Sequence, residues 1–376
     1  MSIDVNLKSL LNYLCDSVDL SKQEQIALRH RQALDFQPVD RLPLVMCYPL
    51  ADDAPFKPYA HSETFSNPEK MLYNQLVFAF DTSIALHDYI DDDLPFTVRA
   101  DFGTVLIASL FGAEIVQMDQ NPPWVVHAPS LDEFKGYLQR DPLDFTQGWL
   151  PKVVNTLKIY NQILSDYPVL KKAIQIVLPD LQGPLDTADL LRGSSLFMEL
   201  ITEPDLIDRA MMLCAQAQIG FARHLKNLIN DGPTGYSHQH AMKVKGNILI
   251  RNDSAVMISP DMYRSQIVPH DEYVLSQMGS GSIHSCGKID HIVQEFMELD
   301  SCKSIDIGQP ELNDLDKIYV LAQKHKVSLV RLSVPQEQLL DGSVMKRFPT
   351  GVTLVHRAEN PQAAQYIMKK YKEKFN

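Results

Sequence analysis

The sequence predicts a single-domain α/β protein, a (β/α)8 barrel of the TIM type with an N-terminal helical extension and an inserted β-hairpin. From about residue 170 onward, short apolar segments alternate with helical segments about five times. This alternation is typical of parallel strands joined by crossover helices. Candidate strands near residues 44, 84 and 115 bring the count to about eight. A doubly wound open sheet is the alternative, but no Gly-x-Gly-x-x-Gly segment follows any predicted strand.

The helical extension is expected over residues 1–40, before a barrel formed by residues 41–376. Leucines at helical spacing indicate a first helix, and Ser21 is the expected N-cap of a second. The leucines are Leu7, Leu10, Leu11 and Leu14. The first buried strand is expected at residues 44–48, and a second at residues 81–88.

An inserted hairpin is predicted from residues 113–117 and 124–127, which are separated by Asn121-Pro122-Pro123. Helices are expected at 69–79 and within 131–166. In the regular part of the chain, strands are expected at 174–178, 246–251, 281–286, 304–307, 327–332 and 351–356. The helices between and after them are expected at 185–200, 204–230, 260–278, 289–299, 312–325, 335–347 and 360–375.

Composition excludes several classes of function. The net charge of −12 over 376 residues argues against a nucleic-acid or anionic-membrane partner. No stretch of about eighteen apolar residues predicts a membrane span. Five widely spaced cysteines, without a signal-peptide pattern, indicate reduced thiols in a cytoplasmic protein.

His284 and Cys286 form the strongest local signal for chemistry. Alternate residues of a strand share a face, so both side chains are expected to point the same way where the strand over 281–286 ends. Imidazole and thiolate are ordinary zinc ligands. The competing interpretation is a chance His-x-Cys pair that only packs, because convincing zinc motifs have three or four ligands.

A barrel places its site at the carboxyl ends of its strands, and this rule selects the other candidates. Cys302 precedes its predicted strand and is therefore expected at the opposite rim. His356 ends the last strand and is the expected third metal ligand. His238 and His240 have ligand-like spacing, but they lie in a segment without an assigned element. The residues at or just beyond predicted strand ends are Asp88, Asp180, Gln182, Asp253, His284, Cys286, Asp306 and His356.

Roles follow from side-chain chemistry. Asp88, Asp253 and Asp306 are expected to be catalytic carboxylates, with helix capping or an arginine ion pair as the alternative for Asp253 and Asp306. The guanidinium groups of Arg99 and Arg331 suit carboxylates of a ligand, or structural ion pairs. The residues expected to contact substrate are Tyr48, Asp180, Gln182 and Arg99.

Several segments together resemble the uroporphyrinogen decarboxylase superfamily. They are Pro179-Asp180-Leu181-Gln182-Gly183-Pro184, Asn252-Asp253-Ser254, Ile258-Ser259-Pro260-Asp261-Met262-Tyr263 and Ile283-His284-Ser285-Cys286-Gly287. The resemblance extends over roughly residues 25–372 and is most specific over 174–310. It implies a (β/α)8 barrel. The superfamily contains porphyrinogen decarboxylases and zinc-dependent methyltransferases that act on corrinoid proteins.

The methyltransferase branch resembles this chain more closely. The decarboxylases carry an arginine-containing segment after the first strand that binds substrate carboxylates. Residues 46–53 here contain no arginine and two acids. The methyltransferases carry His-x-Cys near the end of a late strand, which His284 and Cys286 match. They also carry a distant cysteine near the last strand, where this chain has His356.

The resemblance implies a zinc-dependent methyltransferase that moves a methyl group between a corrinoid such as methylcobalamin and a thiol or similar acceptor. Zinc would be held by His284, Cys286 and His356, with Asp253 and Asp306 orienting ligands. The implied partners are a small-molecule or corrinoid-protein substrate and a second copy of the chain. Decarboxylation of a porphyrinogen is one alternative, with Asp88 or Asp253 stabilising a protonated pyrrole. A non-catalytic corrinoid- or tetrapyrrole-binding protein is another.

Overall fold

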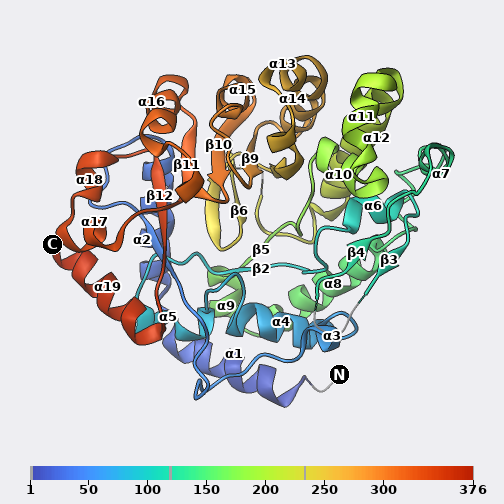
Figure 1. Ribbon diagram of the computed structural model, residues 1–376. Coiled ribbons are helices and arrows are strands. Elements are labelled where there is room, and N and C mark those ends of the chain that lie inside the picture. The colour runs from blue at the N-terminus through green and yellow to red at the C-terminus, as the bar shows by residue number, and fades with distance from the viewer. Residues whose placement is uncertain (1–2, 118–120, 233, 376) are drawn as a thin grey trace.

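The main sheet of this α/β protein contains six parallel strands. The computed structural model describes residues 3–117, 121–232 and 234–375 (Figure 1). The strands lie in the order β1-β12-β11-β10-β9-β8. Their residues are mostly buried, as expected for parallel strands covered on both faces. The bounds are β1 (Leu44–Cys47), β8 (Leu249–Arg251), β9 (Gly281–Ser285), β10 (Cys302–Ile307), β11 (Ser328–Ser333) and β12 (Val352–Arg357).

A second parallel pair, β2 (Thr97–Val98) and β5 (Gln175–Ile176), lies between the two edges of the main sheet. At one edge, the segment after β5 pairs with β8 through a bridge between Gln182 and Arg251. At the other edge, the segment before β2 contacts β1, because the Asp93 amide donates to the Leu44 carbonyl at 3.0 Å. The two sheets are therefore joined at both edges.

Two antiparallel hairpins accompany these sheets. Strands β3 (Ile115–Val116) and β4 (Trp124–Val125) form the inserted hairpin that the sequence predicts. Strands β6 (Tyr236–Gln239) and β7 (Met242–Lys245) form a second one, here called the inner hairpin, which the sequence analysis did not predict.

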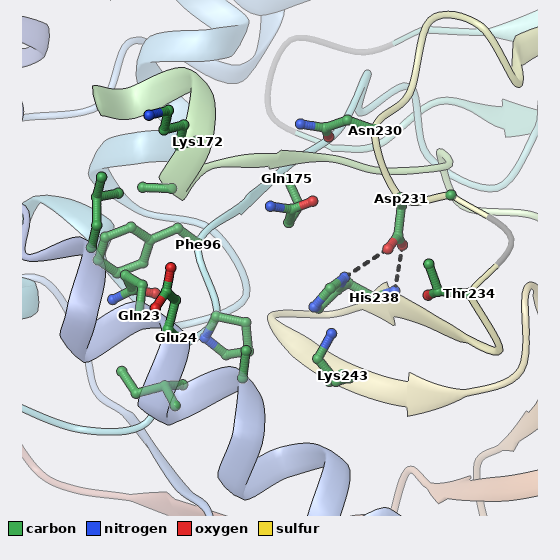
Figure 2. Close-up of a pocket in the computed structure, with 16 residues that line it drawn as sticks. Gln23, Glu24, Phe96, Lys172, Gln175, Asn230, Asp231, Thr234, His238 and Lys243 are labelled. Atoms are coloured by element: carbon green, nitrogen blue, oxygen red, sulfur yellow. Dashed lines mark hydrogen bonds and ion pairs between the residues drawn. The ribbon is translucent and has the colours of Figure 1, made fainter. Parts of the chain in front are cut away.

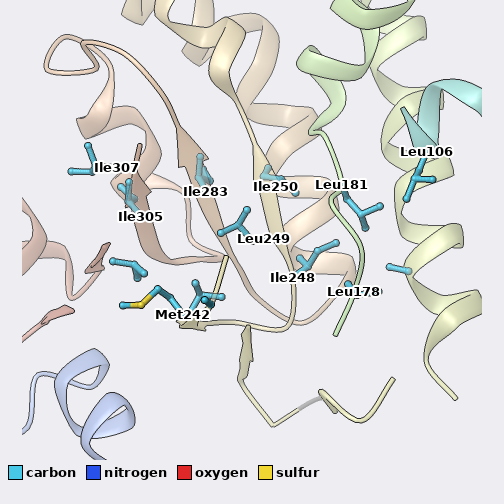
Figure 3. Packing of buried hydrophobic residues seen from close by; sticks show 14 of the residues in the cluster. Leu106, Leu178, Leu181, Met242, Ile248, Leu249, Ile250, Ile283, Ile305 and Ile307 are labelled. Atoms are coloured by element: carbon cyan, nitrogen blue, oxygen red, sulfur yellow. The ribbon is translucent and has the colours of Figure 1, made fainter. Parts of the chain in front are cut away.

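The inner hairpin packs on the sheet side that the outer helices leave free. Its strand β7 contacts β9, β10 and β11. The Ser282 hydroxyl donates to the Lys245 carbonyl at 2.5 Å, and the Lys245 amide donates to the Ser304 hydroxyl at 3.1 Å. Figure 3 shows Met242 among the core residues of the neighbouring strands. The hairpin turn is thereby carried toward the carboxyl ends of the strands.

Helices cover the other side of the strands (Figure 1). For example, α14, α15 and α16 contact β9, β10 and β11. At the amino terminus, Asp4 and Asp19 cap the first two helices by accepting backbone amides. Among the described residues, no helix is long and apolar enough to cross a bilayer. The α-helices are α1 (Val5–Ser17), α2 (Leu20–Leu34), α3 (His61–Thr64), α4 (Pro68–Val77), α5 (His87–Ile90), α6 (Leu106–Leu110), α7 (Leu131–Tyr137), α8 (Leu150–Ser165), α9 (Pro168–Ala173), α10 (Pro184–Arg192), α11 (Ser195–Thr202), α12 (Pro204–Leu225), α13 (Pro260–Met262), α14 (Val268–Gln277), α15 (Val293–Glu298), α16 (Leu315–His325), α17 (Gln336–Asp341), α18 (Val344–Arg347) and α19 (Pro361–Glu373).

The prediction of a strand at residues 81–88 was wrong. This segment forms a 3-10 turn, η1 (Ile84–Leu86), followed by α5. The tight turn before it places Phe80 and Asp81 at φ 54° and 59°, which ends any extended run. Ile84 and Ala85 of η1 are buried by packing beside α4 rather than by pairing in the sheet. The second strand in chain order is therefore β2.

Candidate metal centre

Three potential metal ligands meet beyond the carboxyl end of β9. His284 Nε2 lies 3.3 Å from Cys286 Sγ and 3.6 Å from Asp253 Oδ1. One ligand atom from each residue lies within 4.8 Å of the others. Asp253 begins η2 (Asp253–Met257), separated from the end of β8 by one residue, and its Oδ1 accepts the Cys286 amide at 2.6 Å. The backbone therefore fixes this carboxylate beside the His-x-Cys pair.

Asp306 on the neighbouring strand orients His284. The parallel register of β9 and β10 places these two residues side by side, and His284 Nδ1 lies 2.8 Å from Asp306 Oδ2. Burial opposes ionisation of Asp306, but Arg331 and the two nearby histidines hold its pKa well below the usual value. An ionised Asp306 accepts the Nδ1 proton, which leaves the Nε2 lone pair directed at Cys286. Histidines that bind metals are commonly fixed in this way.

Gly308 leaves the space that this group needs. A Cβ at this position would lie 2.7 Å from Cys286 Sγ and 3.1 Å from His284 Cε1. Any other residue here would therefore displace both side chains. The Asp253 side chain is 40% exposed, whereas that of His284 is 4% exposed. The group is thus open to solvent on the Asp253 side.

The charge of the group favours a bound cation. Burial, together with the neighbouring Asp253 carboxylate, raises the pKa of the Cys286 thiol to about 12. The thiol is therefore protonated at neutral pH unless a cation stabilises the thiolate. A divalent cation would neutralise both the thiolate and Asp253.

A second group shares His284 with the first. His240, His284 and Asp306 also offer ligand atoms within 4.8 Å of one another. His240 lies at the turn of the inner hairpin, with Nδ1 3.7 Å from Asp306 Oδ2. Both turn residues, His240 and Ala241, have positive φ (45° and 60°), a conformation that costs non-glycine residues energy. Asp306 would have to serve as a ligand here while it also contacts Arg331.

A buried layer of ion pairs surrounds this centre. Arg251 Nε donates to Asp180, and Arg99 Nη1 lies 3.4 Å from the same carboxylate. Burial works against the charge of Asp180, but Arg99 and Arg251 keep its pKa well below the usual value. Arg331 Nη1 lies 3.6 Å from Asp306. The Phe80 ring covers Arg99, with a distance of 4.4 Å from the guanidinium carbon to the ring centroid.

The structure thus brings together many of the residues that the sequence selects. Asp253, His284, Cys286 and Asp306 form the centre, and Asp180 lies in the ion-pair layer with Arg99. Gln182 contributes its backbone, through the bridge to Arg251 and a carbonyl that accepts the Thr187 hydroxyl at 3.3 Å.

The other predicted residues lie elsewhere. His356 lies on β12, in register with Met46 on β1. Burial lowers the pKa of its ring, whose neighbours are the Val334 backbone and Glu337. It does not join His284 and Cys286, because alternation along β12 directs it to the helix-covered side.

Asp88 belongs to α5, not to a strand end, and its half-exposed side chain lies 3.0 Å from His87. Tyr48 is buried, and burial, with the nearby Asp92 carboxylate, raises its pKa. Cys302 begins β10 and is buried, at the end of the strand opposite the candidate centre.

The sequence did not point to three contributors, Phe80, Arg251 and Gly308, and it offered His240 only as a possible ligand in a segment without an assigned element. The inner hairpin left only a weak signal, an alternating segment at 242–245 preceded by a His-Ala turn instead of Asn-Gly. Arg251 stands at a predicted strand end, but no partner could be assigned before the position of Asp180 was known.

Comparison with known proteins adds evidence about the fold. No family model and no curated protein matches this sequence. Among solved structures, a methyltransferase from Methanosarcina mazei is similar, with a TM-score of 0.63 and 17% sequence identity. The match covers 93% of this chain and 99% of that one. The likeness therefore concerns the fold of nearly the whole chain.

Proposed function

We propose that this protein is a zinc-dependent methyltransferase that moves a methyl group between a corrinoid and a thiol. The observation that carries the proposal is the convergence of Asp253, His284 and Cys286, with His284 oriented by Asp306. The fold likeness to a methyltransferase supports it. We also infer that the eight parallel strand segments form a (β/α)8 barrel, because backbone contacts join both edges of the main sheet to the β2–β5 pair.

The residues fit zinc in number and in kind. Zinc takes thiolate, imidazole and carboxylate ligands, and catalytic sites commonly use three protein ligands and one open position. The glycine at 308 leaves room for the ligand atoms, and the exposed side of Asp253 admits a further ligand. We prefer this group to the one containing His240, because Asp306 already holds Nδ1 of His284 and leaves Nε2 free.

Bound zinc would supply one chemical effect, a lowered pKa of an acceptor thiol, so that the thiolate forms near neutral pH. The chain's own residues provide the rest of the site. Asp306 fixes the ring of His284, and Arg331 keeps Asp306 ionised. Phe80 and the Arg99–Asp180 pair close the buried side, so an acceptor thiol would enter past Asp253.

Porphyrinogen decarboxylation has less support. That reaction requires free arginines to bind several substrate carboxylates. The arginines near the centre, Arg99, Arg251 and Arg331, are each within 4.0 Å of an aspartate of the chain. They are therefore already paired.

The proposal is tested by metal content and methyl transfer together. We expect about one zinc per chain in the purified wild type, and thiol-dependent demethylation of methylcobalamin with small thiols such as cysteine or 2-mercaptoethanol. Cys286→Ala should lose both. His356→Ala is the matched control and should keep both, because the ring lies away from the centre. Wild-type protein without zinc, or Cys286→Ala with unchanged zinc, would contradict the proposal.

A further inference from the structure

A cavity of about 310 Å³ lies at the opposite ends of β2 and β5 from the candidate metal centre. Phe96, just before β2, and Gln175, the first residue of β5, line one wall. Helix α2 and the inner hairpin form others (Figure 2). This volume is at the lower end of the range for small-molecule sites.

The inner hairpin presents a polar face to this cavity. His238 and Lys243 are directly opposite each other in the β6–β7 register, so their side chains share one face. Met242 and Val244 occupy the other face and are buried in the core. The hairpin therefore separates the apolar core from two nitrogen-bearing side chains that line the cavity.

His238 is held by a carboxylate that leaves one ring nitrogen for a ligand. Its Nδ1 lies 2.9 Å from Asp231 Oδ1, and its backbone amide donates to Asp231 Oδ2 at 2.6 Å. Figure 2 shows the other ring nitrogen turned away from Asp231. Burial lowers the pKa of His238, so the ring is neutral. With the proton on Nδ1, Nε2 is a hydrogen-bond acceptor that suits a hydroxyl group.

Lys243 brings a buried amine without a carboxylate partner. The residue is 9% exposed, and within the described residues no carboxylate lies within 4.0 Å of Nζ. The centroid of the Tyr236 ring lies 5.9 Å from Nζ, and Asp231 attracts the ammonium group without forming a direct ion pair. By contrast, Lys245 on the same face pairs with Asp35 at 2.7 Å. Burial of an unpaired ammonium is unfavourable, and an anionic ligand would remove that cost.

We propose that this cavity binds a small hydroxylated anion. Its carboxylate or phosphate group would pair with Lys243, and its hydroxyl would donate to His238 Nε2. Gln175 lies on the facing wall and offers an amide to the same ligand. Asp231 keeps its negative charge beside the neutral His238, and Glu24 also lines the cavity, so the anionic group is expected at Lys243 and the hydroxyl on the Asp231 side. The site is separate from the metal centre and independent of the proposed methyltransferase activity.

Calorimetric titration of the full chain tests this site. The probes are malate, glycerol 3-phosphate and succinate, at matched ionic strength. We expect malate or glycerol 3-phosphate to bind, and the stronger of the two identifies the anionic group. Succinate, which lacks the hydroxyl, should bind more weakly. Lys243→Met should weaken binding by about tenfold or more, because a charge-assisted hydrogen bond is lost.

Lys172→Met is the control, because Lys172 lies exposed at the rim of the same cavity. This variant should keep its affinity for the anion within about twofold of the wild type, because ion pairs made by exposed side chains contribute little free energy. A thermal unfolding curve for each variant establishes that it is folded. The site assignment is overturned if neither hydroxylated anion binds, or if both lysine variants weaken binding equally. Equal binding of succinate and malate overturns the role of His238.

Discussion

His284 Nδ1 lies 2.8 Å from Asp306 Oδ2, on the adjacent strand of the main sheet. Neighbouring parallel strands thus supply a metal ligand and the carboxylate that orients it. The relationship depends on register: a shift of one residue would direct Asp306 to the opposite face of the sheet.

Asp306→Asn should therefore weaken zinc binding by about 10- to 100-fold while leaving all three ligands in place. The asparagine keeps the size of the side chain but removes the charge that fixes the Nδ1 proton. Competition with a chelator measures the affinity. Asp88→Asn, which changes a half-exposed residue away from the centre, should behave as the wild type. Equal affinities for Asp306→Asn and the wild type would falsify the orienting role.

Gly308→Ala should remove zinc through steric conflict alone. The added Cβ would lie 2.7 Å from Cys286 Sγ, well inside van der Waals contact. Zinc per chain is measured by elemental analysis, and circular dichroism reports the fold. Gly136→Ala is the matched control, since nothing lies within 4 Å of a Cβ placed there on α7. If Gly308→Ala retains full zinc, the ligand atoms do not converge at this point.

Two variants distinguish the two candidate ligand groups. His240→Ala should keep zinc, because the preferred group is Asp253, His284 and Cys286. Asp253→Ala should lose it. The opposite pattern would place the metal between His240, His284 and Asp306 instead. His240 also contacts Arg251, so melting temperatures must accompany the zinc measurements.

Much of the fold was predictable because its signals are local. Strands β9 to β12 are short, largely buried segments that alternate with helices, and their ranges agree with prediction to within about two residues. The strand predicted at 81–88 failed because its apolar residues are equally compatible with a buried 3-10 turn. The inner hairpin was missed because its strands are rich in polar residues, one of which, Lys245, pairs with the distant Asp35 that only the folded chain brings near.

The candidate site was predictable where ligands share one strand or the start of a loop. His284 and Cys286 share a face by alternation, and Asp253 and Asp306 follow from the rule that sites lie at strand ends. His356 satisfied the same rule but points to the helix-covered side. The rule gives the height of a residue along a strand, whereas the direction of the side chain depends on register with the neighbouring strand. For β12 that register became known only from its pairing with β1.

Asp271 gives a prediction for the pH dependence of stability. This carboxyl is fully buried on α14, where it accepts hydrogen bonds from Tyr263 and Asn252. Burial raises its pKa to about 7. In the unfolded chain the value is about 3.9. Between these two values the folded chain retains a proton that the unfolded chain has lost, so this group lowers the free energy of unfolding as pH rises from about 4 to 7.

Asp271→Asn should remove that contribution, because an asparagine resembles the protonated acid in shape and stays neutral. Relative to the wild type, the variant should gain stability as pH rises, by about 1.4 kcal/mol for each pH unit inside the window. Urea unfolding at pH 5, 6, 7 and 8 measures the difference. Asp261→Asn, an exposed substitution at 93% side-chain exposure, should show a difference that hardly changes with pH. A pH-independent difference for Asp271→Asn would mean that the carboxyl is ionised in the folded protein throughout.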